Sequence, residues 1–287
     1  MGMFDSPLRY PGGKGRLTQH VIDLIELNDL VGAPYIEPYA GGAGIALPLL
    51  YLEYVDHIHL NDLDRSVYAF WHSVLNRTEE FARLVRDTPL TVEEWRTQRA
   101  LQFSQEEVET LALGFSTFYL NRTSRSGIIR GGCIGGINQT GKWKIDARYK
   151  ADVLSRRIEK VASYASRISL YNLDAAELIE KVLPTLPRRA LVYLDPPYYD
   201  NGSKLYKASY QHDDHGKIAH LAGDIGQSWI VSYDNVEPIR QFYAAYRQQS
   251  FGLPYSAQRV YEGVEVMVYG NGLEIPGPIR PYRGMAA

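Results

Sequence analysis

The chain has 287 residues, of which 45% are hydrophobic and 22% charged, so it can bury the core of one large domain or two smaller ones. Its net charge of -2 excludes a uniformly basic surface, and its single cysteine excludes an intrachain disulfide or a zinc site built from cysteines. The start of the chain has no signal-peptide pattern and no run of about 18 apolar residues occurs, which predicts a soluble, cytoplasmic protein.

A glycine-rich segment with a lysine, residues 9–16, comes first. It differs from a Walker phosphate loop because no strand precedes it and Gly15 stands where that loop has Ser or Thr. Its glycines allow a ligand to approach the backbone closely, while Lys14 supplies a positive charge and Tyr10 an aromatic ring. The segment predicts either a ligand contact or a flexible N-terminal turn.

A strand, a glycine loop and a helix follow, in the order that opens a Rossmann-like unit. The strand is expected at residues 34–39, the loop at 40–44 and the helix at 45–52. Two of the glycines fit a dinucleotide-binding loop, but Leu47 stands where the third is required.

The second expected strand, residues 57–64, ends in the acids Asp62 and Asp64, with Asn61 before them, about 20 residues past the glycines. A carboxylate in that position binds ribose hydroxyls, and the missing third glycine argues against a pyrophosphate. S-adenosyl-L-methionine has a ribose and no pyrophosphate, so the sequence predicts it as the cofactor. His57 and His59 share one face of this strand, but without a third ligand nearby they predict no metal site.

The alternation of strands and helices lapses over residues 76–150, which predicts an inserted domain. Residues 79–109 are polar, helical and acidic, and residues 111–120 are expected to form a buried helix. Residues 121–160 hold ten Lys or Arg against three acids, so phosphate and base-edge contacts are favoured over a solvated basic loop. Cys133 lacks a neighbouring base and is expected to be a small buried or loop residue.

The alternation resumes with an expected helix at residues 151–165, a strand at 168–173 and a helix at 175–182. Asp174 precedes the last of these as its N-cap. Its place at a strand end also suits a hydrogen bond from the amine of a cofactor adenine.

The central motif, residues 191–199, is a run of four apolar residues followed by Asp-Pro-Pro-Tyr-Tyr. The apolar part predicts a strand buried on both faces of a parallel sheet, and the prolines must end it. Asp195 therefore lies at the carboxyl end of a buried strand, where ligands bind in open α/β sheets. Its carboxylate and the Pro196 carbonyl suit the two hydrogens of an exocyclic amine, and Tyr198 suits the flat face of a planar substrate. A simple strand-ending turn is the alternative.

Towards the end of the chain, the acids and histidines at residues 212–215 predict a capped helix start rather than a metal site. A strand at residues 229–233, a helix at 236–246 and a final strand at 264–269 are expected next. Past Asn271 the Gly- and Pro-rich sequence predicts a loose tail.

These motifs, in this order, resemble the Dam-type family of adenine-specific DNA methyltransferases in the α arrangement. The resemblance covers nearly the whole chain up to about Asn271, from the lysine segment and glycine loop to the Asp195-Pro196-Pro197-Tyr198 motif. The fold it implies is α/β, a Rossmann-like S-adenosylmethionine-dependent methyltransferase sheet with an inserted, mostly helical and loop-rich target-recognition domain. It implies a catalytic, cofactor-binding domain of residues 1–75 and 151–287, and a DNA-binding insert of residues 76–150.

The resemblance also implies three groups of site residues. Catalysis is assigned to Asp195, Pro196, Pro197 and Tyr198. Cofactor binding is assigned to Tyr10, Lys14, Glu37, Tyr39, Gly41, Gly42, Gly44, Asp62, Leu173, Asp174 and Asp195, with Tyr10 and Lys14 at the methionine end. DNA binding is assigned to Asn121, Arg122, Arg125, Arg130, Gln139 and Lys142. Arg125 and Ser126 replace the aromatic and amide residues that the family uses at DNA, so the resemblance does not extend to its familiar GATC target.

The implied activity is transfer of a methyl group from S-adenosyl-L-methionine to the exocyclic amine of adenine in double-stranded DNA. The base is flipped out of the stack, and transfer is direct and in line, without a metal. A monomer is expected, with restriction–modification as one possible setting. The alternatives left open are the same chemistry on an RNA base or a protein glutamine, and a DNA-binding regulator that has lost catalysis.

Overall fold

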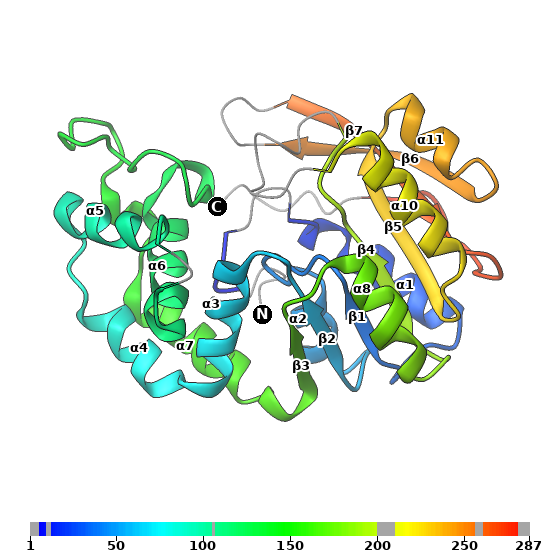
Figure 1. Ribbon diagram of the computed structural model, residues 1–287, viewed down its shortest axis with the longest axis horizontal. Coiled ribbons are helices and arrows are strands. Elements are labelled where there is room, and N and C mark those ends of the chain that lie inside the picture. Colours follow the sequence, from blue (N-terminus) through cyan, green and yellow to red (C-terminus); the bar gives the residue numbers. More distant parts are fainter. Residues whose placement is uncertain (1–5, 10–12, 105–106, 200–209, 256–260, 281–287) are drawn as a thin grey trace. The chain divides into compact units, whose positions relative to one another are not determined.

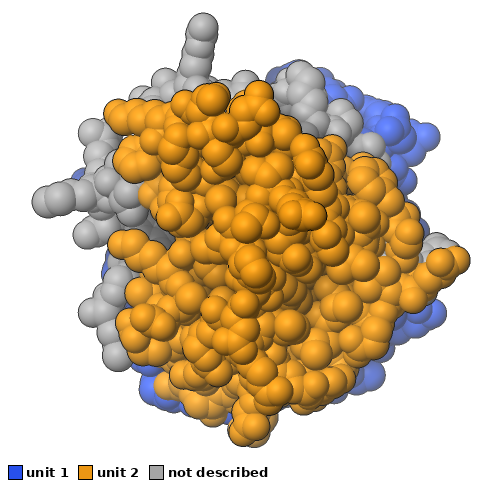
Figure 2. Space-filling view, turned by 90° about the vertical axis from the view of Figure 1, so that its left-hand side faces the viewer, with its two compact units in different colours: residues 1–4, 14–63, 167–287 blue, residues 5–13, 64–166 orange. Residues whose placement is uncertain are grey.

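The structure, a computed structural model, describes residues 6–9, 13–104, 107–199, 210–255 and 261–280. The chain divides into two compact units, drawn in blue and orange in Figure 2. Unit 1 comprises residues 1–4, 14–63 and 167–287, and unit 2 comprises residues 5–13 and 64–166. Unit 2 contains all of residues 76–150, the stretch predicted as an insert, and extends beyond it on both sides.

Unit 1 is built on a mixed sheet with the strand order β3-β2-β1-β4-β5-β7-β6 (Figure 1). Strands β1 to β5 are parallel, while β7 runs antiparallel between β5 and β6. β4 lies between β1 and β5, and all four of its residues are buried. The predicted Rossmann-like α/β sheet is therefore confirmed. The strands are β1 (Tyr35–Glu37), β2 (Ile58–Asn61), β3 (Ile168–Tyr171), β4 (Leu191–Leu194), β5 (Ser228–Asp234), β6 (Arg247–Tyr255) and β7 (Tyr261–Tyr269).

One face of this sheet buries a hydrophobic core against three helices. Val192 of β4, Val231 of β5 and Val266 of β7 belong to this core, because alternate residues of a strand point to the same face. Apolar side chains of the helices cover them. The three helices are α8 (Ala175–Glu177), which continues as a π-helical turn to Val182, α10 (His212–Gly223) and α11 (Glu237–Phe242).

The other face carries polar side chains at the positions in between. Tyr193, Ser232 and Glu265 are each the neighbour in sequence of one of the three valines, so the period of two places all three on this face. Helix α1 (Thr18–Leu27) lies on the same side, because Nε2 of His20 is hydrogen-bonded to the hydroxyl of Tyr269 at 2.9 Å. A polar cluster on the sheet thus follows from strand alternation once the strands are paired.

Two elements of unit 1 were absent from the sequence prediction. Helix α1 has no side chain that caps its first turn, and such a cap is the usual signal of a helix start. Strand β6 begins with the polar run Arg247-Gln248-Gln249-Ser250, as an edge strand can, and this run shows no apolar alternation.

The loose tail expected past Asn271 is wrong for the residues described there, up to residue 280. Leu273 and Ile279 are buried. The backbone N–H of Glu274 donates to Oδ1 of Asn28 at 2.7 Å, and Nδ2 of Asn28 donates back to the Glu274 carbonyl at 2.9 Å. Apolar burial and a reciprocal amide pair therefore hold this segment on the end of α1.

Unit 2 is helical in its described residues. Its central helix is α6, which contacts α3, α4 and α5 and has residues 113–123 buried without interruption. The rings of Phe70 and Phe81 pack against Phe118 of α6. The buried helix predicted at residues 111–120 is therefore confirmed. No helix in the described parts of either unit is long and apolar enough to span a membrane. The helices of unit 2 are α3 (Arg65–Asn76), α4 (Thr78–Asp87), α5 (Val92–Leu101), α6 (Thr110–Thr123) and α7 (Ala151–Ala162).

A glycine-rich loop, residues 124–150, connects α6 to α7, and Gln139 determines its shape. Nε2 of Gln139 donates to the carbonyls of Ile134 and Gly136, both at 2.7 Å. Oε1 of Gln139 accepts the backbone N–H of Ile145 at 2.9 Å. Cys133, in the same loop, is buried as predicted. One amide side chain thus connects residues 134–136 to residue 145 within this loop.

Replacement of Gly114 by alanine tests how closely α6 packs on α3. A methyl group at this position would lie 2.4 Å from the backbone oxygen of Ala69, which is too close for any relaxed contact. Alanine by itself favours a helix over glycine by about 1 kcal/mol, so any loss of stability must come from this clash. We expect Gly114→Ala to lower the free energy of unfolding in urea by about 1–3 kcal/mol.

Gly132→Ala is the control for this measurement, because nothing lies within 4 Å of a methyl group added there. A Gly114→Ala protein that is as stable as the wild type, or more stable, would contradict the close approach of the two helices.

Candidate active site

The candidate site begins at the carboxyl end of β4, where Asp195 follows the last buried residue of the strand. This position is the one that the sequence predicts. The side chain of Asp195 is 22% exposed, so it is held by the protein and still open to a ligand. The hydroxyl of Ser232 donates to its Oδ1 at 2.7 Å, and the hydroxyl of Tyr193 lies 2.8 Å from that of Ser232. Asp195 is therefore oriented by the polar face of the sheet.

Lys14 is the cation of the site. Its Nζ lies 2.8 Å from Oδ1 of Asp195 and 3.5 Å from Oε1 of Glu265, and it donates to the hydroxyl of Tyr198 at 3.0 Å. Burial by itself lowers the pKa of the Lys14 ammonium, but the attraction of Asp195, Glu265 and Tyr198 raises that pKa well above its usual value. Lys14 is thus a buried, charged lysine that faces the Asp195 carboxylate.

Tyr198 is buried and held at its hydroxyl. That hydroxyl donates to Oε1 of Glu265 at 2.5 Å, and Nζ of Lys14 lies 4.8 Å from the centre of its ring. The next residue fixes the turn, because the backbone N–H of Tyr199 donates to Oδ1 of Asp234 at 2.9 Å. Glu265 was not among the predicted site residues. Its only signal in the sequence is a carboxylate inside residues 264–269 of β7, a run that is otherwise apolar.

The two oxygens of the Asp195 carboxylate differ in their partners. Oδ1 is bound by both Lys14 and Ser232. Among the residues that the structure describes, none donates a hydrogen bond to Oδ2. One oxygen therefore fixes the group in place, and the other is left as a hydrogen-bond acceptor for a ligand.

The glycine loop and the acid predicted to bind ribose lie together at the ends of β1 and β2. Oδ2 of Asp62 accepts the backbone N–H of Gly41 at 3.0 Å. Gly41 has a φ of 46°, in the left-handed region that favours glycine. Asn61 ties the neighbouring chain to this point, because its side chain donates to the carbonyls of Pro38 and Leu173 and accepts the N–H of Leu173.

The remaining predicted cofactor residues are placed as follows. Oδ1 of Asp174 accepts the backbone N–H of Ala176 at 2.9 Å, which confirms its predicted role as an N-cap. The hydroxyls of Tyr39 and Tyr210 lie 2.9 Å apart. Any methyl group on Gly44 would be 3.4 Å from the backbone nitrogen of Gly15, so the glycine loop lies against the lysine segment. Gly42 lies in the same loop, and Tyr10 lies outside the described residues.

Glu37, also predicted to bind the cofactor, is buried and bonded within unit 1. Its Oε1 accepts the hydroxyl of Tyr35 at 3.1 Å and the backbone N–H of Ala46 at 3.2 Å. Burial raises the pKa of Glu37 to about 8, although these two hydrogen bonds lower it, and the charge of Asp195 raises it further. Near neutral pH this carboxyl is therefore mostly protonated.

The residues predicted to bind DNA differ in burial and fall into three groups in unit 2. Asn121 and Arg122 are buried: the Asn121 side chain bonds both backbone groups of Arg9, and Nε of Arg122 donates to the Pro7 carbonyl at 2.8 Å. Both bind the chain's own backbone, and sequence patterns cannot show this. Gln139 is half-buried and shapes the loop, as described above. The exposed members of the set are Arg125, Arg130 and Lys142.

The histidines considered as metal ligands have other partners. His57 is hydrogen-bonded to Ser169 and His59 to Tyr171. The segment at residues 212–215 begins α10 with a capping box between Gln211 and Asp214, so the predicted helix start is confirmed. Within the described ranges, no group of three or more His, Cys, Asp or Glu side chains is placed to hold a metal.

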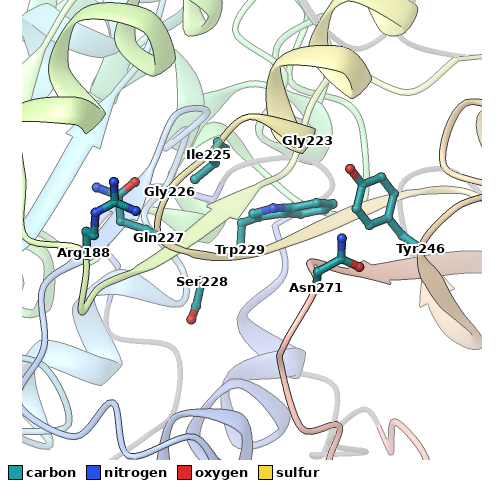
Figure 3. A pocket seen from close by; sticks show the side chains of 9 residues that line it. All are labelled: Arg188, Gly223, Ile225, Gly226, Gln227, Ser228, Trp229, Tyr246 and Asn271. Atoms are coloured by element: carbon teal, nitrogen blue, oxygen red, sulfur yellow. The ribbon is translucent and has the colours of Figure 1, made fainter.

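A pocket of about 230 Å³ lies apart from this site (Figure 3). Ser228 and Trp229 begin β5, and β5 runs parallel to β4. The pocket therefore lies at the amino ends of these strands, whereas Asp195 lies at the carboxyl end of β4. No carboxylate is among the described residues that line it, which are Arg188, Gly223, Ile225, Gly226, Gln227, Ser228, Trp229, Tyr246 and Asn271.

Known proteins resemble this chain in sequence and in fold. A model of the family described as D12 class N6 adenine-specific DNA methyltransferase matches residues 10–259. A proposed RNA methyltransferase from Pyrococcus horikoshii is 10% identical, with 92% of this chain and 87% of that chain covered and a TM-score of 0.45. The rRNA methyltransferase AviRa from Streptomyces viridochromogenes is 10% identical, with coverages of 91% and 86% and a TM-score of 0.38. TrmK from M. capricolum, in complex with S-adenosyl-homocysteine, is 8% identical, with coverages of 88% and 71% and a TM-score of 0.35. No curated protein matches the sequence.

The buried carboxyl of Glu37 makes the stability of the protein depend on pH. Its pKa is about 8 in the fold against an ordinary value of 4.5, so between these values the folded state holds a proton that the unfolded chain has released. The stabilisation from protonated Glu37 is fully present below its ordinary pKa of 4.5, and it is lost as the pH rises through its pKa of about 8 in the fold. Glu37→Gln lacks the titration, so its free energy of unfolding relative to wild type is expected to rise by at most about 1.4 kcal/mol per pH unit from about pH 5 to 8.

Urea unfolding of both proteins across this pH range measures the difference, with Glu180→Gln, an exposed carboxyl of the same unit, as the control. Parallel pH profiles for the wild type and Glu37→Gln would show that Glu37 is ionised in the fold.

Proposed function

The chain belongs to the D12 class N6 adenine-specific DNA methyltransferase family, and we propose that it methylates the exocyclic amine of adenine in double-stranded DNA. The methyl donor of this chemistry is S-adenosyl-L-methionine. The observation that carries the proposal is the Asp195 carboxylate, which is fixed through Oδ1 and has Oδ2 left as an acceptor. An amine nitrogen becomes positive as it accepts a methyl group, and a fixed carboxylate beside it stabilises that charge.

The amine is recognised through its two hydrogens. Oδ2 of Asp195 accepts one hydrogen and the carbonyl of Pro196 accepts the other. With both hydrogens held, the nitrogen lone pair points at the methyl group of the cofactor, and transfer is a direct in-line displacement. Asp195 acts as a carboxylate in this step. The N–CH3 bond forms as the S–CH3 bond breaks, S-adenosyl-homocysteine leaves, and the methylated ammonium then releases one proton to water.

Tyr198 provides the surface on which the target base lies. An adenine inside a duplex cannot reach Asp195, so the base is flipped out of the stack at a cost of a few kcal/mol. Stacking on an aromatic ring returns about 1–3 kcal/mol of that cost. The Tyr198 ring is suited to this task because its hydroxyl is already bonded to Glu265 and does not need to be ordered when the base arrives.

The cofactor is assigned to the loop between β1 and helix α2 (Ala46–Tyr51) and to the ends of β2 and β3. Asp62 binds the ribose, and Asp174 and Leu173 lie at the adenine. Gly41, Gly42 and Gly44 allow the cofactor to approach the backbone. Tyr10, Glu37 and Tyr39 are assigned to the cofactor by the family resemblance alone. Lys14 is better assigned to the orientation of Asp195 than to the methionine end, since its ammonium is buried against that carboxylate.

Four arginines of unit 2 support a nucleic acid as the substrate. Arg122 and Arg157 both donate to the carbonyl of Ser6, at 3.5 and 3.3 Å. Burial and the charges of Arg157 and Arg9 lower the pKa of Arg122 to about 9, and burial and Arg148 lower the pKa of Arg9. None of the four forms an ion pair with a carboxylate of the described residues. Arg122 is buried, but Arg9 and Arg157 are half-buried and Arg148 is exposed, so these three are suited to the phosphates of DNA.

The glycine-rich loop of unit 2 supplies the groups for base contact. Arg125, Arg130 and Lys142 are exposed, and Trp143, beside Lys142, is 63% exposed. Asn121 and Arg122 are assigned a positioning role, because both are buried and hold residues 6–9. Long cationic and aromatic side chains on a loop of fixed shape are typical of base-edge contacts in a groove. A monomer that acts on duplex DNA is the expected form.

Asp195→Ala tests the catalytic assignment. The variant keeps the ion pair of Lys14 with Glu265, so it is expected to fold and to bind S-adenosyl-L-methionine. We expect no methyladenine in DNA from cells that lack adenine methylation and express this variant, and methyladenine at one sequence motif with the wild-type chain. Single-molecule sequencing measures both. Loss of cofactor binding together with turnover would contradict this division of roles, and no methyladenine with the wild type would point to RNA or protein as the acceptor.

Arg148→Gln tests the phosphate assignment. Loss of one phosphate contact is expected to weaken binding to all duplex sequences alike and to reduce the slope of log affinity against log salt by about one. Fluorescence anisotropy of a labelled duplex across a range of NaCl concentrations measures the slope. Lys181→Gln is the control, because Lys181 is exposed in unit 1 and pairs with Glu177. An unchanged slope for Arg148→Gln would remove this arginine from the interface.

A further inference from the structure

Glu265 is a buried carboxylate that no catalytic motif contains. It lies in β7, 1% exposed, on the same face of the sheet as Ser232 and Tyr193. Its Oε1 accepts the hydroxyl of Tyr198 at 2.5 Å and lies 3.5 Å from Nζ of Lys14. Burial of a carboxylate is costly, so a position of this kind needs the positive charge and the hydrogen bond that it receives here.

The charges around Asp195 show what Glu265 adds. Lys14 carries one positive charge and lies 2.8 Å from Asp195. With only these two groups, the pair would have no net charge, and a base that gains positive charge on methylation would find little attraction there. With Glu265 ionised, the cluster of three has a net charge of -1. The second carboxylate therefore restores the negative potential that Lys14 removes.

Glu265 also fixes the geometry of the site through two groups. The Tyr198 hydroxyl donates a hydrogen bond to Oε1 of Glu265, and Nζ of Lys14 lies close to the same oxygen. Nζ of Lys14 also donates to the Tyr198 hydroxyl. The lysine is thus held between two carboxylates, and the tyrosine ring is held at its outer end. Neither group is free to turn towards solvent when the substrate is absent.

We infer that Glu265 is a positioning residue for methyl transfer, which acts through Lys14 on the charge of Asp195 and through the hydroxyl on the ring of Tyr198. The inference rests on the proposed amine methylation. Glu265 is called a positioning residue because it is assigned no contact with the substrate or the cofactor. It adds to the catalytic motif a residue from the antiparallel strand of the sheet.

Glu265→Gln tests the inference, because the amide keeps the size and the acceptor of the side chain and removes its charge. We expect the single-turnover rate of methyl transfer to fall by about 10- to 100-fold, as is common for coupled groups in one ion-pair network, with the affinities for cofactor and DNA within about twofold. The acid limb of the pH–rate profile should move to lower pH, since the positive charge of Lys14 then acts on Asp195 without compensation. Lys14→Met should move the acid limb to higher pH, and the acid limb of the double variant should fall between those of the two single variants.

Other groups near Asp195 stay the same in all these variants, so the shifts report the Lys14–Glu265 pair. They are the carboxyl of Glu37 and the phenols of Tyr35, Tyr193, Tyr198 and Tyr233.

Met267→Leu is the matched control, because Met267 is buried two residues further along the same face of β7 and lies beside Ser232 in the sheet. It is expected to leave the rate and the acid limb unchanged. A slower Glu265→Gln enzyme with an unmoved acid limb would indicate a role in packing alone and would overturn the inference. A Glu265→Gln enzyme whose rate and acid limb both match the wild type would overturn the inference as well.

A second measurement separates this inference from the proposed function. The titration of the Asp195 carboxyl, followed by 13C NMR in the wild type and in Glu265→Gln without any acceptor, reports the same coupling and requires no turnover. If that titration moves and the wild type methylates no DNA, the network holds and the proposed substrate is wrong. If it does not move, Glu265 has no influence on Asp195, whatever the substrate.

Discussion

A buried ion pair between Lys14 and Asp195 is the interaction on which the candidate site depends. Either charge alone in this position would cost several kcal/mol, because the surrounding strands and the tyrosine rings replace the water that would solvate it. Glu265 adds a second carboxylate beside Lys14, so the three side chains together carry one more negative charge than positive charge. The fold must therefore bring the segment before α1, the end of β4 and the middle of β7 to one point, and the sheet order does so by placing β5 and then β7 beside β4.

The sheet separates structure and chemistry between its two faces. Valines on one face pack under α8, α10 and α11, and the residues next to them in sequence point to the other face. Tyr193, Ser232 and Glu265 come from three strands, yet they form one chain of contacts around Asp195 because their strands are neighbours. A shift of one residue in the register of β7 would place Glu265 among the valines.

Local patterns in the sequence predicted much of this site. The apolar run before Asp195, the glycines followed by Asp62 and the N-cap at Asp174 each depend on a few adjacent residues, and the structure places them as expected. The signal was strong because strand ends, tight loops and caps are set by short-range physics.

What the sequence could not show depends on contacts between distant segments. The role inferred for Glu265 depends on its contact with Lys14, and the pairing of β7 with β5 brings the two side chains together. Asn121 and Arg122 read as exposed DNA contacts, but they are buried against residues 6–9. Strand β6 and helix α1 lack the alternation or the cap that marks such elements. In each case the deciding partner lies far away along the chain.

The place of β7 has a consequence for the protein during its synthesis. Among the described strands it comes last in the sequence, and it inserts between β5 and β6, so the edge of β5 stays unpaired until residues 261–269 have been made. Lys14 leaves the ribosome about 250 residues before Glu265 and until then has one carboxylate partner instead of two. A nascent or shortened chain thus has its cofactor loop and its Asp-Pro-Pro-Tyr turn but an incomplete centre. The centre is complete only when β7 has paired with β5.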